Sequence, residues 1–275
     1  MLAAGRAGDY ASAMSRYNFA SQRLFLDMPL GEGARVALDR DQANYLVNVL
    51  RMAPGDAVLV FNGRDGEWRA VLDGDRKRAL LLVEARTRMQ GPAATLDYLF
   101  APLKQARLDY MVQKAVEMGV GRLSPIITRR TQVTRLNAER LRANAIEAAE
   151  QCGILSIPEI GAQRPLCAVL AAWPVEEQGR RIVFCDEDEA GQDPVAVLGR
   201  LAPGPLAVLI GPEGGFSPEE RTLLRALPFV TPIALGPRIL RADTAAVAAL
   251  ALVQAVAGDW KADGGLLDHK NVIAT

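Results

Sequence analysis

One stretch decides the fold of this 275-residue chain: Ala207-Val208-Leu209-Ile210-Gly211-Pro212-Glu213-Gly214-Gly215-Phe216-Ser217-Pro218-Glu219-Glu220. Its apolar start is typical of a strand that is buried on both faces. Ser217, Pro218 and Glu220 match an N-cap, a first-turn proline and the last member of a capping box, so they predict a helix from Pro218. Because open α/β sheets bind ligands beyond the carboxyl ends of their strands, the Gly-rich turn is a candidate ligand site.

The spacing of this turn excludes two common phosphate sites. It lacks the Gly-Lys-Ser/Thr end of a P-loop and the glycine spacing of a dinucleotide fingerprint. Glu213 would also repel a phosphate, so a ligand without phosphate, carrying cationic groups, fits better. The alternative is a tight turn whose glycines only supply positive φ, a conformation that we expect for Gly214 and Gly236.

A second stretch has the same layout: Ile233-Ala234-Leu235-Gly236-Pro237-Arg238-Ile239-Leu240-Arg241-Ala242-Asp243-Thr244-Ala245-Ala246. The helix predicted after it, 245–257, carries no charge, so we expect it to be buried on most sides, in the core or against another subunit. Arg238 and Arg241 stand at its start, where a cation opposes the helix dipole. They either face a substrate or are solvated surface residues.

The pattern of elements predicts two units. Short strands at 23–26, 35–38, 56–61, 67–72 and 79–85, with one helix at about 41–52, indicate a small β-barrel. From residue 95 strands and helices alternate: strands at 95–101, 123–127, 182–185, 206–210 and 229–235, and helices near 108–115, 138–151 and 218–226. This alternation predicts a mostly parallel α/β sheet. The expected boundaries are a lead at 1–15, the barrel at 16–88, a linker at 89–94, the α/β domain at 95–260 and a tail at 261–275.

The two Gly-Pro stretches resemble the signature loops of the ribosomal RNA small subunit methyltransferase E family. The segments 108–120 and 146–153 are similar to helices of that family, and the likeness runs from about Arg16 to Ala257. The resemblance implies a SPOUT-type, trefoil-knotted, parallel-sheet methyltransferase domain preceded by a PUA-like β-barrel that grips RNA. It also implies methyl transfer from S-adenosylmethionine to N3 of a uridine in small-subunit (16S) rRNA, within an assembled or assembling 30S particle, by a homodimer.

The resemblance also assigns residues. The implied cofactor pocket comprises Leu209, Gly211, Gly214, Gly215, Leu235, Gly236, Ile239, Leu240, Thr244 and Ala245. The expected catalytic residues are Arg241 and Arg238, which would stabilise a uracil anion, and Glu213 as proton acceptor. This chain departs from the family in having no histidine pair at 41–46, and in reading Arg241-Ala242-Asp243-Thr244 where Arg-Thr-Glu-Thr is expected.

Composition agrees with a cytoplasmic RNA-modifying enzyme. Zero net charge hides an asymmetry, with 22 basic and 17 acidic residues in 1–150 against 10 and 15 afterwards. Acidic residues are interleaved with these basic ones, so the alternative is a solvated surface of mixed charge. The candidate RNA contacts are Arg16, Arg23, Arg51, Arg64, Arg76, Lys77, Arg78, Arg129, Arg130 and Arg135. Neither a membrane span nor a signal peptide is expected.

The remaining residue types suggest no further chemistry. Cys152, Cys167 and Cys185 are odd in number and widely spaced, which predicts buried free thiols in a reducing compartment. The single histidine, His269, lies in the polar tail, and no metal site is expected.

Three other functions remain open on the sequence. A related knotted methyltransferase acting on tRNA or on a ribose 2′-hydroxyl would share the cofactor loops, and the modified nucleoside would distinguish it. A non-catalytic RNA-binding module would need only the barrel and would not bind S-adenosylmethionine. A nucleotide-dependent α/β enzyme is disfavoured by the missing phosphate fingerprints.

Overall fold

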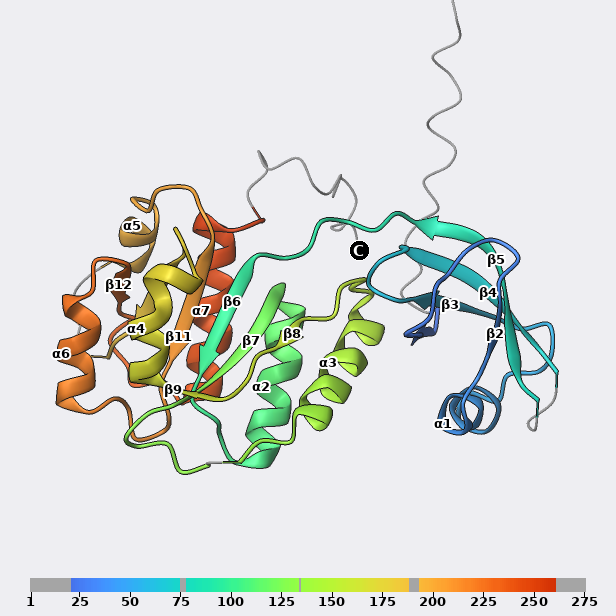
Figure 1. Ribbon diagram of the computed structural model, residues 1–275, viewed down its shortest axis with the longest axis horizontal. Coiled ribbons are helices and arrows are strands. Elements are labelled where there is room, and N and C mark those ends of the chain that lie inside the picture. The colour runs from blue at the N-terminus through green and yellow to red at the C-terminus, as the bar shows by residue number, and fades with distance from the viewer. Residues whose placement is uncertain (1–20, 75–77, 134, 188–192, 261–275) are drawn as a thin grey trace, which may run out of the picture. The chain divides into compact units, whose positions relative to one another are not determined.

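The computed structural model describes residues 21–74, 78–133, 135–187 and 193–260. The chain divides into two compact units: unit 1, residues 1–90 with Glu150–Leu155, and unit 2, residues 91–149 with 156–275. Figure 1 shows the strands and helices of each. Arg16, Arg76, Lys77, His269, the predicted lead and the predicted tail lie outside the described residues.

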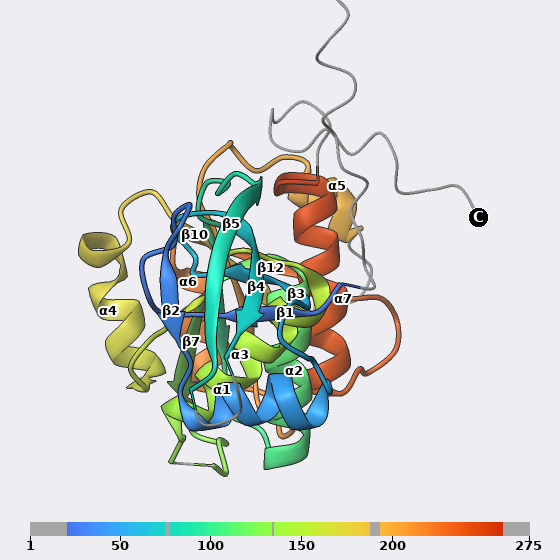
Figure 2. The same ribbon diagram turned by 90° about the vertical axis from the view of Figure 1, so that its right-hand side faces the viewer.

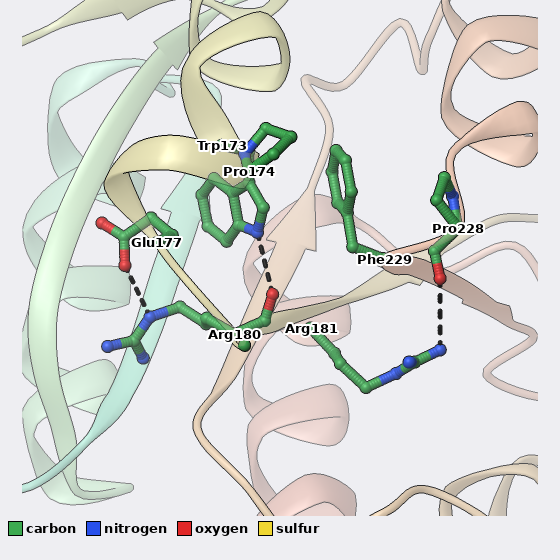
Figure 3. A pocket seen from close by; sticks show the side chains of 8 residues that line it. Trp173, Pro174, Glu177, Arg180, Arg181, Pro228 and Phe229 are labelled. Atoms are coloured by element: carbon green, nitrogen blue, oxygen red, sulfur yellow. Dashed lines mark hydrogen bonds and ion pairs between the residues drawn. The ribbon is translucent and has the colours of Figure 1, made fainter.

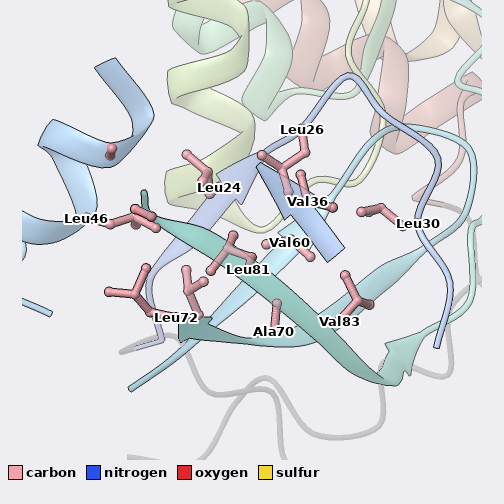
Figure 4. Packing of buried hydrophobic residues seen from close by; sticks show 13 residues of the cluster. Leu24, Leu26, Leu30, Val36, Leu46, Val60, Ala70, Leu72, Leu81 and Val83 are labelled. Carbon is pink, nitrogen blue, oxygen red and sulfur yellow. The ribbon is translucent and has the colours of Figure 1, made fainter. Parts of the chain in front are cut away.

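Unit 1 contains a five-stranded half-barrel sheet in the order β1-β3-β4-β5-β2. Its strands are β1 Arg23–Phe25, β2 Arg35–Ala37, β3 Ala57–Phe61, β4 Glu67–Asp73 and β5 Leu80–Arg88. Two register shifts between β4 and β5 give the sheet local bends, as β-bulges do. Alternate residues of the strands fill one core, which includes Val60, Leu72 and Leu81 (Figure 4). The predicted strands are thus confirmed, with β5 ending three residues later than expected.

The helix predicted at 41–52 is shorter than expected and changes type. Regular helix α1 covers only Arg40–Asn44, after a capping box made by Asp39 and Gln42. A single π-helical turn, Tyr45–Val49, follows (η1), and it buries Leu46 fully in the core. Figure 2 shows this helical segment at one end of the sheet. Arg51 ends it at φ +56°, the only positive φ among the described residues other than glycine.

Unit 2 is built on a parallel sheet in the order β12-β10-β11-β6-β7-β8, and β9 adds to β7. The strands are β6 Leu96–Phe100, β7 Val120–Ile127, β8 Glu159–Ile160, β9 Arg164–Pro165, β10 Arg181–Cys185, β11 Leu206–Ile210 and β12 Val230–Ile233. The helices are α2 Gln105–Glu117, α3 Ala138–Cys152, α4 Leu166–Glu176, α5 Pro194–Leu198, α6 Pro218–Ala226 and α7 Ala242–Ala257. Helices α4 and α5 and strands β8 and β9 were not predicted from the sequence.

Helices cover both faces of this sheet. On one face, α4 and α6 pack against strand residues that include Leu99, Ile182 and Leu209. On the other, α2 and α7 contact β7 and β11 respectively, and Figure 2 shows α4 and α7 on opposite sides. All five residues of β11 are buried, as predicted for a strand that is covered on both faces of the sheet. The knot implied by the family resemblance stays a prediction.

Within this chain, helix α7 is buried on one face, and the expected burial of its remaining sides against another subunit stays a prediction. Ala246, Ala249, Leu250 and Val253 are fully buried, whereas Leu252 and Val256 are partly exposed and Ala255 is exposed. Buried Gln254 donates a hydrogen bond of 2.8 Å to the carbonyl oxygen of Met118, just after α2. This bond satisfies one of the carbonyls that a helix end leaves without a partner.

The cysteine prediction is partly wrong. None of the three described cysteines forms a disulfide, but Cys152 and Cys167 are exposed on α3 and α4. Only Cys185, at the end of β10, is largely enclosed, and burial raises the pKa of its thiol well above the ordinary value. None of the described helices is long and apolar enough to cross a membrane.

Candidate active site

The two glycine turns lie at the same edge of the unit 2 sheet. One follows β11 and the other follows β12, and both strands run parallel to β10, which lies between them. Their carboxyl ends therefore meet at one edge, where parallel sheets bind ligands. The turn after β11 leads into α6 through the predicted capping box, in which Ser217 and Glu220 each accept from the other's backbone N–H.

The glycines of these turns have different roles. Gly215 and Gly236 take positive φ values of +67° and +96°, which disfavour any residue with a Cβ. A Cβ at Gly236 would meet no atom within 4 Å, so the space beside it is open to a ligand. A Cβ at Gly211 would lie 2.6 Å from the ring of Phe216, so this glycine is needed for packing. Gly214 is not at positive φ, contrary to our expectation, because the left-handed residue of this turn is Gly215.

The remaining candidate cofactor residues differ in exposure. Leu209 is completely buried inside the sheet, so only its backbone could face a ligand at this edge. Leu235 and Leu240 are partly buried, and Thr244 is exposed in the first turn of α7, next to partly buried Ala245. Ile239 is 88% exposed, the largest value among the exposed large hydrophobic residues. An apolar side chain of this kind, between two arginines, is suited to cover a ligand.

Arg238 and Arg241 are both exposed. Neither guanidinium has a hydrogen bond or ion pair with any residue that the structure describes. Arg241 is the N-cap of α7 and provides no side-chain cap, although its carbonyl oxygen accepts from Ala245 N–H at 2.7 Å. Both guanidinium groups therefore remain available for a ligand or substrate.

Glu213 lies at the tip of the first turn and is exposed. One carboxylate oxygen is 3.8 Å from Nη1 of Arg107, in the first turn of α2. This is a loose ion pair, so the carboxylate can still accept a proton or a hydrogen bond from a ligand. Arg107 was not anticipated as a site residue, because 106 positions separate it from Glu213.

A loop after β7 holds the first glycine turn in place. Arg130 donates a hydrogen bond of 2.7 Å to the carbonyl oxygen of Gly214, and Arg129 donates its backbone N–H to Glu220 at 2.8 Å. The guanidinium of Arg129 also lies 3.1 Å from a carboxylate oxygen of Glu219. Both arginines were predicted to contact RNA. The structure shows that each already has a partner at the start of α6 or in the turn.

A carboxylate pair after β10 completes the edge, and the sequence analysis missed it. Asp186 is buried and forms ion pairs with Arg221 and Arg225 of α6, at 3.3 and 2.7 Å. Glu187 also pairs with Arg221, and a Cβ on Gly215 would lie 3.1 Å from its carboxylate. The acidic run after an apolar strand was a usable signal, since such residues lie at the carboxyl edge of a parallel sheet.

Of the other predicted RNA contacts that the structure describes, Arg23, Arg51, Arg64 and Arg78 lie in unit 1 and Arg135 lies in unit 2. Arg51 and Arg64 are exposed, and Arg64 forms an ion pair of 3.2 Å with Asp27. Arg23 is a correction: it is 3% exposed and pairs with buried Glu67 at 3.0 Å, so it stabilises the core and cannot meet RNA. Within the described residues, no group of three or more His, Cys, Asp or Glu side chains could hold a metal.

Known proteins with the same two parts resemble this chain. An RNA methyltransferase domain family matches residues 90–254, and an RNA methyltransferase PUA domain family matches residues 38–84. The ribosomal RNA small subunit methyltransferase E of Rickettsia conorii is 30% identical over 84% of this chain and 94% of its own length. The protein of that name from Bacillus subtilis is 26% identical over 84% of this chain and 95% of its own length.

Solved structures extend the likeness to the fold. A ribosomal RNA small subunit methyltransferase E from Neisseria gonorrhoeae, bound to S-adenosylmethionine, has a TM-score of 0.75 and 26% identity, covering 88% of this chain and all of its own. A chain from Legionella pneumophila, in complex with the same cofactor, has a TM-score of 0.72 and 28% identity, over 86% of this chain and 98% of its own.

Proposed function

This chain belongs to the ribosomal RNA small subunit methyltransferase E family, and from that premise we propose that it methylates N3 of a uridine in small-subunit rRNA. The family establishes an S-adenosylmethionine-dependent rRNA methyltransferase with a PUA domain. The uracil base and its N3 atom are the proposed part. One observation carries it: Arg238 and Arg241, which have no side-chain partner among the described residues, and the carboxylate of Glu213 lie after β12 and β11, at the carboxyl edge of the unit 2 sheet.

The turns fit the cofactor by their shape and their charge. Gly236 leaves open space, Ile239 is exposed beside it, and the first turn carries a carboxylate where a phosphate-binding loop would need positive charge. We assign the backbone of Gly211, Gly214, Gly215 and Gly236 to hold S-adenosylmethionine, with Leu235, Ile239 and Leu240 covering its adenine. When bound, the cofactor supplies an electrophilic methyl group on a sulfonium.

The chain's own groups then act on the uracil. N3 must lose its proton before it can attack, and negative charge spreads onto the two neighbouring carbonyl oxygens. The guanidinium groups of Arg238 and Arg241 donate to those oxygens more strongly as the charge develops, which lowers the barrier. Glu213 accepts the N3 proton. The new N3–carbon bond replaces the sulfur–carbon bond, whose electron pair stays on sulfur.

The substrate is small-subunit rRNA in an assembled or assembling 30S particle in the cytoplasm, gripped by unit 1 through exposed residues such as Arg51 and Arg64. The active form is a homodimer. Its support is the partly exposed apolar face of α7, with Leu252 and Val256, since a monomer would leave this face in water.

Mass spectrometry of nucleosides tests the proposal. Small-subunit rRNA from a strain lacking the gene should contain no 3-methyluridine at the target, and a plasmid copy should restore it. A plasmid copy carrying Arg241→Ala should not. Loss of a ribose methylation, or of a tRNA modification, would assign the chain to a different reaction of the same cofactor.

A further inference from the structure

Unit 2 has a pocket at the edge of the sheet opposite the glycine turns. It has a volume of about 320 Å³ and is lined by residues before β10 and β12 and at the end of α4. The lining includes Arg181, the first residue of β10, and Phe229, directly before β12. Since the glycine turns follow the other ends of these strands, a strand length of about 15 Å or more separates the two sites.

Rings form the wall of this pocket. Trp173 and Phe229 are stacked with centroids 6.3 Å apart and an angle of 19° between their planes. Pro174 and Pro228 extend this apolar surface on either side, as Figure 3 shows. The indole N–H of Trp173 already donates to the carbonyl oxygen of Arg180 at 2.9 Å. Trp173 is 3% exposed and lies behind Phe229, so Phe229 and the two prolines supply the flat apolar surface that a planar group would meet.

Arg181 supplies a polar group without a partner in this pocket. Its Nε is buried and has no hydrogen-bond partner among the described residues. Its Nη2 makes two contacts, to the carbonyl oxygen of Pro228 and to Oγ1 of Thr231, and both are long at 3.4 Å. A buried donor left unsatisfied is costly, and the long Nη2 contacts hold the guanidinium only weakly, so a turn of this side chain toward an acceptor on a ligand would be favoured.

The one carboxylate in the pocket is already neutralised. Glu177 pairs with Arg180 at 2.8 Å and also with Arg122. Burial raises the pKa of Glu177, but hydrogen bonds and charge from both arginines lower it by more, so the pKa lies below its ordinary value. Glu177 is therefore ionised and paired at neutral pH. The positive charge of Arg181 is the one left over, which suits an anion.

We propose that this pocket holds an unpaired nucleotide of the RNA substrate, with its base against Phe229 and the prolines and its phosphate on Arg181. Flat surface for a base and a guanidinium for the phosphate are the two elements by which proteins bind single-stranded RNA. The proposal rests on the proposed function for RNA as the substrate. It adds a contact remote from the methyl-transfer site that helps to position the particle.

A fluorescence titration tests the pocket without methyl transfer. The chain contains three tryptophans, Trp68, Trp173 and Trp260. In a Trp68→Phe/Trp260→Phe background, uridine 5′-monophosphate should quench Trp173 saturably, with S-adenosylmethionine present at saturation to fill the cofactor site. Uridine without the phosphate should bind at least severalfold more weakly. Failure of the N3 assignment would leave this titration unaffected.

Arg181→Gln is the decisive variant, and Arg200→Gln is its control, because Arg200 is exposed and does not line the pocket. Arg181→Gln should weaken the mononucleotide by tenfold or more and raise KM for the 30S particle severalfold, with the affinity for S-adenosylmethionine unchanged. Arg200→Gln should change neither. Three results would each overturn the proposal. They are an absence of saturable quenching, an equal loss of mononucleotide affinity in both variants, and dissociation of a dimer by Arg181→Gln.

Discussion

At the scale of single residues, Arg241 gives the sharpest test of the chemistry. It is exposed beside the open glycine turn. Removing a donor that strengthens in the transition state typically costs on the order of a hundredfold in turnover, about 3 kcal/mol. Arg241→Ala should lose that much in single-turnover rate while keeping S-adenosylmethionine affinity within a few fold by calorimetry. Arg241→Lys should recover part of the rate. An unchanged rate in Arg241→Ala would show that Arg241 takes no part in methyl transfer.

Gly236 tests the cofactor pocket at the same scale. Valine there would combine a left-handed φ of +96° with a side chain in the open space, so S-adenosylmethionine binding should be lost. Gly33→Val is a matched control, because Gly33 has a φ of +79°, has nothing within 4 Å of its Cβ position and lies in unit 1. Calorimetry on folded protein measures both. Equal affinity in the two variants would remove Gly236 from the pocket.

Among the elements, the loop after β7 decides how rigid the first turn is. Arg130→Ala removes the 2.7 Å bond to Gly214 and should weaken S-adenosylmethionine severalfold, with a smaller effect on KM for the 30S particle. Arg129→Ala, which removes an exposed ion pair, should have little effect on the cofactor. The reverse pattern, in which KM for the particle rises and cofactor affinity stays constant, would favour direct contact of Arg130 with RNA.

The β4–β5 pair of unit 1 depends on the ionised form of Glu67. Burial raises the pKa of Glu67, but the hydrogen bonds from Arg88, Thr87 and Arg23 and the charge of Arg88 lower it by more. The pKa therefore lies below its ordinary value. Stability from such a carboxylate is present above its unfolded pKa and is lost as pH falls through its lowered folded pKa. We expect unit 1 to weaken below about pH 4.3.

Glu67→Gln should cost about 3 kcal/mol at pH 7, because it removes the charge partner of a buried arginine. The loss in free energy of unfolding caused by Glu67→Gln should become smaller at acid pH, where Glu67 itself is protonated. Glu84→Gln, at an exposed pair with Arg69, should cost less than about 1 kcal/mol. Urea unfolding followed by the fluorescence of Trp68, in β4, measures both. A Glu67→Gln loss that does not change with pH would contradict the ionic account.

The element boundaries show what the sequence could and could not predict. Ser217, Pro218 and Glu220 set the start of α6 by local capping, and the structure matches that prediction. Helix α4 was missed because it is apolar along its length and contains Pro174, so it lacks a clear helical period. The roles of Arg107 and Arg130 could not be predicted, since the fold brings each to its partner from more than 80 residues away.

For the whole molecule, the homodimer is the main expectation. Leu252→Glu places a charge on the partly exposed face of α7, and it should dissociate the dimer while leaving each chain folded, since this face is not part of the chain's own core. Light scattering with circular dichroism checks both points. Val247→Glu, at another partly exposed position of α7, maps the extent of the interface. A wild-type monomer at micromolar concentration would contradict the dimer.

Methyl transfer to uridine N3 can be measured in a single reconstituted reaction. Purified protein is incubated with 30S particles from the strain that lacks the gene and with S-adenosylmethionine carrying a deuterated methyl group, and the rRNA nucleosides are then identified by mass spectrometry. We expect deuterated 3-methyluridine in one small-subunit rRNA fragment, and none with Arg241→Ala. Label on another nucleoside, or on a ribose, would contradict methyl transfer to N3.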